Sequence, residues 1–351
     1  MIQDIPALAA RAGFEIAGVA AVGEIPDFAR FSNWVVRGHA GAMRYLTDYR
    51  AALRQDVRRL LPSARSVICV GKLYNGPEPC STAYSDSERG WIARYAWGED
   101  YHGVLRRGLE RLASELGEAA GPHEWKACVD TAPVLERSLA HAAGLGWIGK
   151  NTCLINQARG SWFFLGELIT SLPLVPAAEQ APDRCGTCTR CIDACPTRAI
   201  LPDGIDSRLC ISYLTIELRG AVDESLRDRV GRHIFGCDIC QDVCPWNGRS
   251  AVTEEFASMP GTFAPPLEKL AALSEPEFLA MFRATPVNRA RYRGFLRNVA
   301  VAMGNSGSAA LIEPLEKLAV FDDELVREHA MWAIRKLKSE TAACTEFHSP
   351  S

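Results

Sequence analysis

Four closely spaced cysteines in the stretch "CGTCTRCIDACP" constrain this chain more than any other feature. They are Cys185, Cys188, Cys191 and Cys195, and Pro196 follows the last of them. Zinc sites usually place two CxxC pairs a dozen or more residues apart. Two steps of three residues, one step of four and then a proline are instead the bacterial ferredoxin pattern. We therefore expect iron–sulfur clusters, and a pair of structural zinc sites is the disfavoured alternative.

A second cysteine run completes the set of ligands. "CDICQDVCP" supplies three cysteines but has Ile234 where the first of the pattern would stand, and Cys210 is the only local replacement. In two-cluster ferredoxins the fourth cysteine of a run ligates the other cluster. We therefore assign one [4Fe–4S] cluster to Cys185, Cys188, Cys191 and Cys244, and the other to Cys195, Cys210, Cys237 and Cys240.

Composition bounds the class of protein. Eight of the thirteen cysteines fall within residues 185–244, and the other five, Cys69, Cys80, Cys128, Cys153 and Cys344, are expected to be ordinary thiols. A hydrophobic content of 48% with 23% charged residues is typical of a soluble globular protein. The net charge of -3 gives no global sign of a nucleic-acid partner. The sequence has no run of 18 apolar residues and no basic leader, so a cytoplasmic protein without a membrane span is expected.

The pattern along the chain predicts an α+β protein of three parts. Residues 1–175 alternate between helical and strand patterns and predict an α/β domain. Residues 176–250 carry the cysteines and predict a ferredoxin-like two-cluster module, which the clusters would stabilise because the segment is too short for its own core. Residues 265–340 are helical, and "LRNVAVAMG" matches "VREHAMWAI" thirty residues later, which predicts HEAT-like repeats.

Local patterns give the expected elements of the first part. They predict helices at residues 49–61, 101–121 and 131–146, and strands at 66–71, 124–130 and 160–174. "GLGWIG", residues 144–149, is a literal G-x-G-x-x-G, but it closes a helix and leads into an extended segment. A dinucleotide fingerprint has the opposite context, so a turn or a close backbone approach is favoured over a nucleotide site.

Asp130, in "CVDTAPVLER", is the most suggestive acid of the first part. It stands at the expected strand–helix junction, a place that collects active sites in α/β sheets. Its apolar neighbours Val129 and Val134 would raise the pKa of the carboxyl and make it a proton donor. On the residues alone, an aspartate that caps the helix is the favoured alternative. The aromatics of "RYAWGEDYHG" are likewise expected either to wall a flat cofactor or to pack into the core.

Several segments together resemble the epoxyqueuosine reductase family over nearly the whole chain. They are "RYAWGEDYH", "VDTAPVLERSLAHAAGLGWIGKNT", "GSWFFLGELIT", "CGTCTRCIDACPTRAI" and "CDICQDVCPWN". The resemblance implies a cobalamin-binding first domain that receives electrons from two [4Fe–4S] clusters. It implies the reduction of epoxyqueuosine to queuosine at the wobble position of tRNA, with Asp130 as proton donor. The D-x-H-x-x-G corrinoid motif is absent because Leu105 stands where glycine belongs, so base-off cobalamin without that histidine ligand is expected.

The resemblance and motif position give candidate contacts. Cobalamin is expected at Arg54, Tyr95, Ala96, Trp97, Asp130, Cys153, Leu154, Ser161 and Trp162. Residues 278–312 hold five arginines and no acid, which favours a phosphate-binding patch once tRNA is the implied substrate, although a solvated helix face is the alternative. The expected tRNA contacts, beside Arg283, are Arg289, Arg291, Arg293 and Arg297.

The implied partners are the anticodon stem-loop of tRNA and an external electron donor such as a flavodoxin or ferredoxin, with the protein itself a monomer. One alternative is a ferredoxin-type electron-transfer adaptor with no chemistry of its own. Another is a corrinoid reductive dehalogenase of a small molecule, which the missing twin-arginine leader and the arginine-rich segment disfavour.

Overall fold

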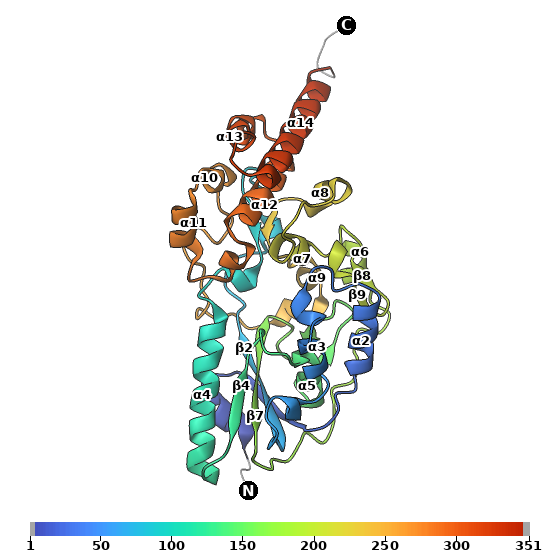
Figure 1. The fold of residues 1–351 in the computed structure, drawn as a ribbon, viewed down its shortest axis with the longest axis vertical. Coiled ribbons are helices and arrows are strands. Elements are labelled where there is room, and N and C mark those ends of the chain that lie inside the picture. Colours follow the sequence, from blue (N-terminus) through green and yellow to red (C-terminus); the bar gives the residue numbers. More distant parts are fainter. Residues whose placement is uncertain (1–3, 347–351) are drawn as a thin grey trace.

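The computed structural model describes residues 4–346, and the side chains of residues 341–346, Cys344 among them, lie outside the described part. The chain forms an elongated molecule, with a sheet and its helices at one end and a group of helices at the other (Figure 1). The first part comprises α1 (Ile5–Arg11), β1 (Ile16–Ala21), α2 (Phe28–Val36), α3 (Arg50–Leu53), β2 (Ser66–Leu73), β3 (Trp91–Ile92), α4 (Tyr101–Ala120), β4 (Trp125–Cys128), α5 (Glu136–Ala142), β5 (Trp147–Ile148), β6 (Leu154–Ile155) and β7 (Phe163–Thr170).

The remaining elements are mostly short helices until the last part of the chain. The cysteine-rich segment contains α6 (Arg190–Ala194), β8 (Ile200–Leu201), β9 (Gly204–Ile205), α7 (Ile211–Ile216), α8 (Glu224–Val230), β10 (His233–Phe235) and α9 (Ile239–Asp242). The last part contains α10 (Leu267–Ala271), α11 (Glu275–Phe282), α12 (Tyr292–Gly304), α13 (Ile312–Leu318) and α14 (Glu324–Glu346). No helix of residues 4–346 is long and apolar enough to cross a membrane.

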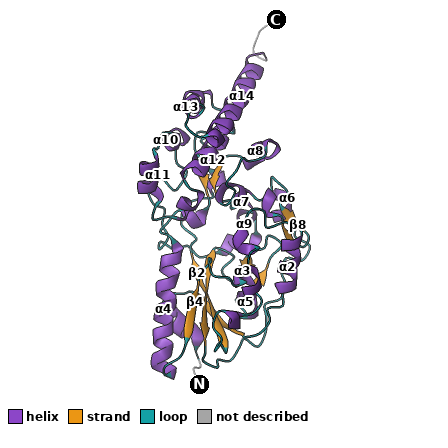
Figure 2. Cartoon of the chain, in the orientation of Figure 1, coloured by secondary structure: helices purple, strands orange, loops and turns teal. Residues whose placement is uncertain are grey.

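A four-stranded sheet in the order β1-β2-β7-β4 organises the first part (Figure 2). Every neighbouring pair in it is antiparallel. Strand β2 is buried along its whole length because both faces of the sheet are covered. Ile68 and Val70 pack with α1 and α4, whereas Val67 and Cys69 pack with α5, as the two-residue period of a strand requires. Because the sheet is antiparallel, the first part is α+β, as expected for the chain as a whole, and the narrower α/β label for residues 1–175 is wrong.

Some of the helices and strands predicted from the sequence are present in the structure, and others are not. Helix α4 and strands β4 and β7 are confirmed. The single helix expected at 49–61 is wrong: the chain makes the short α3 and then a 3-10 turn at Val57–Arg59. Asp56 breaks the helix, since its carboxylate accepts the backbone N–H of Arg58 and starts the new turn. Helix α5 begins five residues later than expected, after a loop that contains Asp130 and Pro133.

The glycines of "GLGWIG" make a turn and a close backbone approach, as expected. Gly144 has φ +77°, and a Cβ on Gly146 would lie 2.2 Å from the carbonyl oxygen of Ile155. The close approach therefore brings α5 against β6 rather than against a flat ligand.

The C-terminal helices share one core with the cysteine-rich segment. Ala300 of α12 and Ala330 of α14 are fully buried in it, together with Ile211, Leu214 and Phe235 from the segment before. The expected helical character of residues 265–340 is confirmed, whereas the HEAT-like assignment stays a prediction. The two helices that carry the thirty-residue match pack directly on each other.

Arg297 is a structural residue, which corrects its assignment to the tRNA surface. Its side chain is 0% exposed in the middle of α12. The guanidinium donates hydrogen bonds to the carbonyl oxygens of Leu214, Leu218 and Gly220, and to the side chain of Asn298. It thereby ties α12 to the end of α7 and cannot reach a phosphate.

We predict that Arg297→Ala lowers the free energy of unfolding by about 3 kcal/mol, because it leaves a cavity in the core and removes the donor from one buried and two part-buried carbonyl groups. Arg293→Ala, on the exposed side of the same helix, should change it by less than about 1 kcal/mol. Chemical denaturation of the two variants measures both values. A change at Arg297 no larger than that at Arg293 would contradict the structural role.

Candidate functional site

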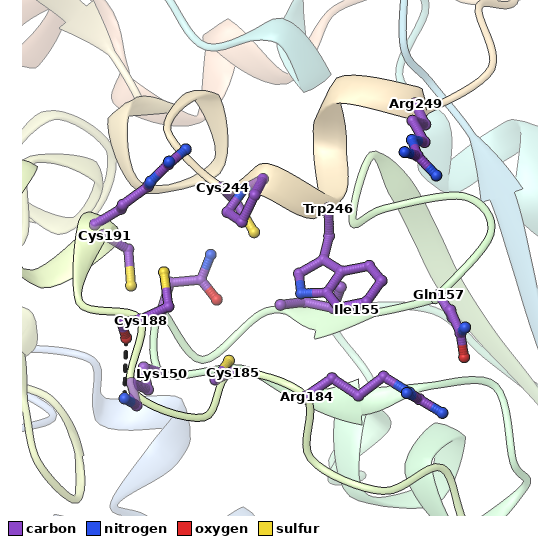
Figure 3. A pocket seen from close by; sticks show the side chains of 13 residues that line it. Lys150, Ile155, Gln157, Arg184, Cys185, Cys188, Cys191, Cys244, Trp246 and Arg249 are labelled. Atoms are coloured by element: carbon purple, nitrogen blue, oxygen red, sulfur yellow. Dashed lines mark hydrogen bonds between the residues drawn. The ribbon is translucent and has the colours of Figure 1, made fainter.

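Four thiols of the cysteine-rich segment surround one cavity. Cys185, Cys188, Cys191 and Cys244 line a space of about 440 Å³, with their sulfur atoms turned toward it (Figure 3). Cys185 and Cys188 lie on the loop that leads into α6, Cys191 lies in its first turn, and Cys244 follows α9, which packs on α6. These are the four ligands expected for the first cluster, and the arrangement of thiols around a cavity suits a cluster of several iron atoms.

The other four cysteines also lie near one another. Burial raises the pKa of the Cys237 thiol, and the neighbouring thiols of Cys210 and Cys195 add to that rise. The pKa of Cys240 is raised first by a hydrogen bond with Cys153, then by burial, with further contributions from Cys237 and Cys210. Residues 195, 210, 237 and 240 therefore form the second group, in agreement with the predicted ligand set, which stays a prediction.

A larger cavity lies on the other side of the second group. One lobe has a volume of about 750 Å³ and is lined by Cys210, Tyr95, Tyr101 and Asp130 among others. A second lobe of about 320 Å³ is lined by Arg54, Trp34 and Glu136 among others. Tyr45, Asp130 and Ile205 line both lobes, so the two adjoin. Together they make a pocket large enough for a large cofactor or for a splayed nucleoside.

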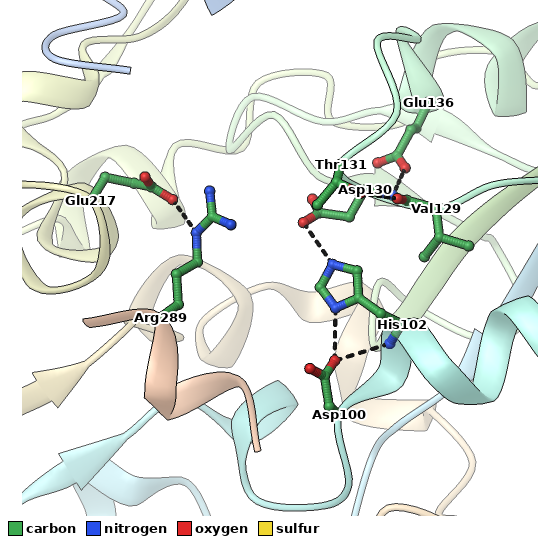
Figure 4. Close-up of polar contacts among 8 residues, drawn as sticks. All are labelled: Asp100, His102, Val129, Asp130, Thr131, Glu136, Glu217 and Arg289. Atoms are coloured by element: carbon green, nitrogen blue, oxygen red, sulfur yellow. Dashed lines mark hydrogen bonds and ion pairs between the residues drawn. The ribbon is translucent and has the colours of Figure 1, made fainter. Parts of the chain in front are cut away.

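Asp130 lies in the loop between β4 and α5 and faces this cavity (Figure 4). Its backbone has φ +42°, an uncommon conformation for a residue with a Cβ. The backbone N–H donates to Glu136 Oε1 at 2.5 Å, and Oδ2 lies 3.1 Å from His102 Nε2. His102 Nδ1 lies 2.7 Å from Asp100 Oδ1, so both ring nitrogens have a carboxylate partner. Asp130 does not cap α5, and the helix-cap alternative is wrong.

The proton of this group resides on His102. Burial lowers the pKa of His102, but the hydrogen bonds and charges of Asp100 and Asp130 outweigh it and raise that pKa to about 9. Burial raises the pKa of Asp130, yet His102, Arg289 and Tyr101 together hold it below its ordinary value. The expected rise in the pKa of Asp130 is therefore wrong. An imidazolium 28 residues earlier in the chain outweighs the apolar neighbours.

Two further carboxyl groups lie behind Asp130. Burial, and then the charge of Asp130, raises the pKa of Glu136 to about 7. Glu167 lies in β7 between Cys69 of β2 and Cys128 of β4. Its carboxyl oxygens are buried without a hydrogen-bond partner among the described residues, and burial raises its pKa well above the ordinary value. Glu167 is therefore neutral, and Glu136 exchanges its proton near neutral pH.

The expected cobalamin residues divide into two groups. Arg54, Tyr95 and Asp130 line the cavity. The side chains of Ala96, Trp97, Leu154, Ser161 and Trp162 are buried in the protein, and the Cys153 thiol hydrogen-bonds with Cys240, so none of these six side chains lines the cavity and their assignment to cobalamin stays a prediction. Trp97, for instance, donates to the carbonyl oxygen of Ile92 and packs edge-on against Phe263. Of the three aromatics proposed as walls, Tyr95 and Tyr101 line the cavity and Trp97 belongs to the core.

Sequence reasoning missed several residues of the site. Tyr45 lines both lobes, and Glu217 forms an ion pair with Arg289 at 2.6 Å across the cavity from Asp130 (Figure 4). Neither lies in a motif, so nothing local could have identified them. Histidine at position 102 was visible in "DYHGVL", but its pairing with Asp130 depends on the fold.

The remaining arginines lie at or near the mouth of the cavity. Arg283 and Arg289 line the larger lobe. Arg291 and Arg293 are exposed at the start of α12, and Arg293 pairs with Asp323 at 3.2 Å. This positive region lies next to the cavity, which is where a polyanionic substrate would have to enter.

Two family models match the chain. The model described as "Epoxyqueuosine reductase QueG, DUF1730" matches residues 54–131, and "4Fe-4S double cluster binding domain" matches residues 184–247. Among curated proteins, the epoxyqueuosine reductase of Xanthomonas campestris pv. campestris is 42% identical over 94% of this chain and 94% of the relative. That of Escherichia coli is 37% identical over 95% of this chain and 88% of the relative.

Solved structures match over the whole length. A crystal structure of epoxyqueuosine reductase with an epoxyqueuosine-modified tRNA-Tyr stem loop has a TM-score of 0.87 at 28% identity and covers 99% of this chain and 94% of the other. An epoxyqueuosine reductase structure from Bacillus subtilis has a TM-score of 0.84 at 28% identity, with 98% and 93% covered. In that structure a catalytic loop carrying an aspartate is swung out of the active site.

We predict eight iron atoms per chain after anaerobic reconstitution, and a loss of about half of them in Cys210→Ala. The second group would lose one of four ligands, and every other cysteine of the segment is already assigned to a cluster. Iron analysis and EPR measure the content and type of cluster. Cys80→Ala, outside both groups, is the matched control. Full iron content in Cys210→Ala would show that the ligand set is wrong.

Proposed function

We propose, from the premise that the chain belongs to the epoxyqueuosine reductase family of oxidoreductases, that it reduces epoxyqueuosine to queuosine in tRNA with protons managed by Asp130 and His102. The observation that carries the proposal is a single cavity. It is lined by the Asp130–His102 pair on one wall and by Cys210, an expected cluster ligand, on another. The groups that would supply protons and the cluster ligand nearest to them therefore face the same cavity.

The described residues fit the groups that the family resemblance implies. The two sets of four thiols would hold two [4Fe–4S] clusters, and the two-lobed cavity would hold base-off cobalamin against Tyr95, Arg54 and Tyr45. When bound, the clusters and the cobalamin supply the two electrons of the reaction. No ring nitrogen of His102 is free to bind a metal, because each already faces a carboxylate.

The chain's own residues supply the protons. Removing the epoxide oxygen as water breaks two C–O bonds, forms one C=C bond, and consumes two electrons and two protons. The imidazolium of His102 holds one proton at the carboxylate of Asp130, which can pass it to the leaving oxygen. Glu136, whose pKa of about 7 leaves it partly protonated at neutral pH, lines the adjoining lobe and is the second source.

The backbone conformation of Asp130 also contributes to the proposed proton transfer. Its φ of +42° is sustained by the hydrogen bond from its backbone N–H to Glu136. Because a catalytic aspartate loop of the Bacillus subtilis relative is found swung out of the active site, we propose that the Asp130 loop is its counterpart and also moves. Glu136 then holds it in the inward position, where Asp130 meets His102.

The RNA side of the proposal rests on the mouth of the cavity. Arg283, Arg289 and the exposed Arg291 would contact phosphates of the anticodon stem-loop, while the modified base would be splayed out into the part of the cavity that the cofactor leaves open. The solved relative bound to a modified stem loop supports this mode of binding. An electron-transfer adaptor without chemistry is disfavoured, because it would not need the three titratable groups His102, Asp130 and Glu136 around a large cavity.

We predict that Asp130→Asn lowers the single-turnover rate on an epoxyqueuosine stem-loop by at least a hundredfold, with both clusters and cobalamin still bound. An amide cannot take a proton from His102 and pass it on, and general acid catalysis is worth roughly 10²–10⁴-fold. The assay uses chemically reduced enzyme so that electron supply does not limit the rate. A near-normal rate in Asp130→Asn would rule out the proton role.

The pH dependence of the same assay provides the control. The folded pKa of His102 lies above its ordinary value of 6.5, so the pair keeps its proton at lower pH and loses it as pH rises through about 9. The wild-type rate should therefore fall above about pH 9. Asp100→Asn removes the negative charge that helps to raise this pKa, so the fall should move to lower pH. An unchanged profile in Asp100→Asn would contradict the assignment of the proton to His102.

For the RNA surface, we predict that Arg283→Glu combined with Arg291→Glu weakens binding of the stem-loop and reduces its dependence on salt. Each lost phosphate contact should flatten the slope of log affinity against log salt by roughly 0.7–0.9. Lys126→Glu combined with Arg229→Glu changes the net charge equally at two exposed sites away from the cavity and should have little effect. An unaltered slope in the first pair would place the RNA elsewhere.

A further inference from the structure

We propose that the surface around the first cluster cavity is the docking site for an acidic protein that carries single electrons, of the ferredoxin or flavodoxin class. The inference rests on the proposed function, because it takes the four thiols around the cavity as cluster ligands. It adds where the electrons enter and which charges select the donor.

Four basic side chains line this cavity together with the thiols. They are Arg190 and, labelled in Figure 3, Lys150, Arg184 and Arg249. The three arginines are exposed and form no salt bridge with any described residue. In a chain with a net charge of -3, such a group of unpaired cations is a local feature. Unpaired surface arginines around a redox site attract a negatively charged partner rather than stabilise the fold.

The fourth basic side chain, Lys150, is held by hydrogen bonds to the cavity wall instead of extending into solvent. Lys150 Nζ donates to the carbonyl oxygens of Gly186, at 2.7 Å, and Cys188, at 2.9 Å. It therefore holds the loop that carries the first thiols. Trp246, which also lines the cavity, packs edge-on against the buried Trp147 and stays partly exposed. A partly exposed aromatic beside arginines is the usual composition of a protein-binding surface.

The position of this cavity separates it from the substrate site. It shares no lining residue with either lobe that contains Asp130. The second group of thiols reaches the larger lobe through Cys210. Electrons accepted at the first cluster cavity therefore have a route through the second group of thiols to the lobe that contains Asp130. A donor protein can also dock while RNA occupies the mouth of that lobe.

RNA is the other polyanion that a basic surface could bind. The substrate site argues against it here, because Arg283, Arg289 and Arg291 already place positive charge beside the cavity that must receive the modified base. The two surfaces therefore predict opposite results in two binding assays, which makes the assignment testable with the complete protein.

The test uses the reconstituted protein and a chemically reduced, acidic plant-type [2Fe–2S] ferredoxin. Stopped-flow absorbance follows cluster reduction without substrate, and calorimetry at low salt measures the affinity for the ferredoxin. We expect the wild-type rate to fall steeply with salt. Arg184→Glu, Arg190→Glu and Arg249→Glu combined should lower the low-salt rate by roughly 10- to 100-fold and flatten its salt dependence.

Controls separate docking from damage to the clusters. Arg65→Glu, Lys126→Glu and Arg229→Glu combined carry the same change of charge at exposed positions without a salt bridge in the described structure, and should reduce the rate far less. Reduction by the methyl viologen radical cation should not slow in the cavity variant. Stem-loop affinity should stay unchanged in the cavity variant and fall in Arg283→Glu/Arg291→Glu.

The following results would overturn the docking site or assign the surface to another partner. A wild-type rate that does not depend on salt, or equal losses in the cavity and control variants, would overturn the docking site. A cavity variant that loses RNA affinity would reassign the surface to RNA. If charge reversal prevents cluster loading, the neutral Arg→Gln set at the same three positions replaces it, with a smaller loss expected. Failure of the viologen-reduced wild type to convert epoxyqueuosine would refute the proposed function alone, since the docking measurement needs no substrate.

Discussion

The cysteine-rich segment has no hydrophobic core of its own, and the architecture follows from that constraint. One side of it packs on the first domain through a small core of Trp147, Ile155 and Cys244. The other side belongs to the large core of the C-terminal helices, through Ile211 and Phe235. The segment is thus held between two bodies that each have their own core. Because the segment lies between these two bodies, its first group of thiols lines the cavity beside Trp246, whereas its second group reaches the cavity of Asp130 through Cys210.

Arg297 shows how polar groups complete that support. The chain turns toward α8 after α7, and the buried guanidinium donates to the carbonyl group of Leu214 in that helix and to those of Leu218 and Gly220 in the turn. Cys210 lies immediately before α7, so the same contact helps to fix an expected cluster ligand next to the cavity that Asp130 faces. A residue that sequence reasoning assigned to RNA instead stabilises the region between cluster and cavity.

Features that depend on residues close together in the sequence could be predicted, whereas features that depend on contacts between distant segments could not. Cysteine spacing is local, so the two groups of thiols were deduced from the chain alone, as were α4, β4 and β7. The protonation of Asp130 was not, because it depends on His102, which the fold brings from another element. Arg297 was misassigned because a helical pattern shows that a face is basic but not that one of its arginines is buried. Tyr45 and Glu217 were missed because pocket walls are assembled from distant segments.

The antiparallel sheet also changes the reason why Asp130 is at the site. In a parallel sheet the carboxyl ends of the strands share one edge, which places such a residue in a crevice automatically. Here β4 is an edge strand of an antiparallel sheet, so topology gives no such guarantee. The position depends on side chains: Glu136 accepts the backbone N–H of Asp130, and His102 at the start of α4 binds its carboxylate. Because a few polar contacts rather than the sheet hold this loop, its departure from the cavity would leave the core undisturbed, as the proposed movement of the Asp130 loop requires.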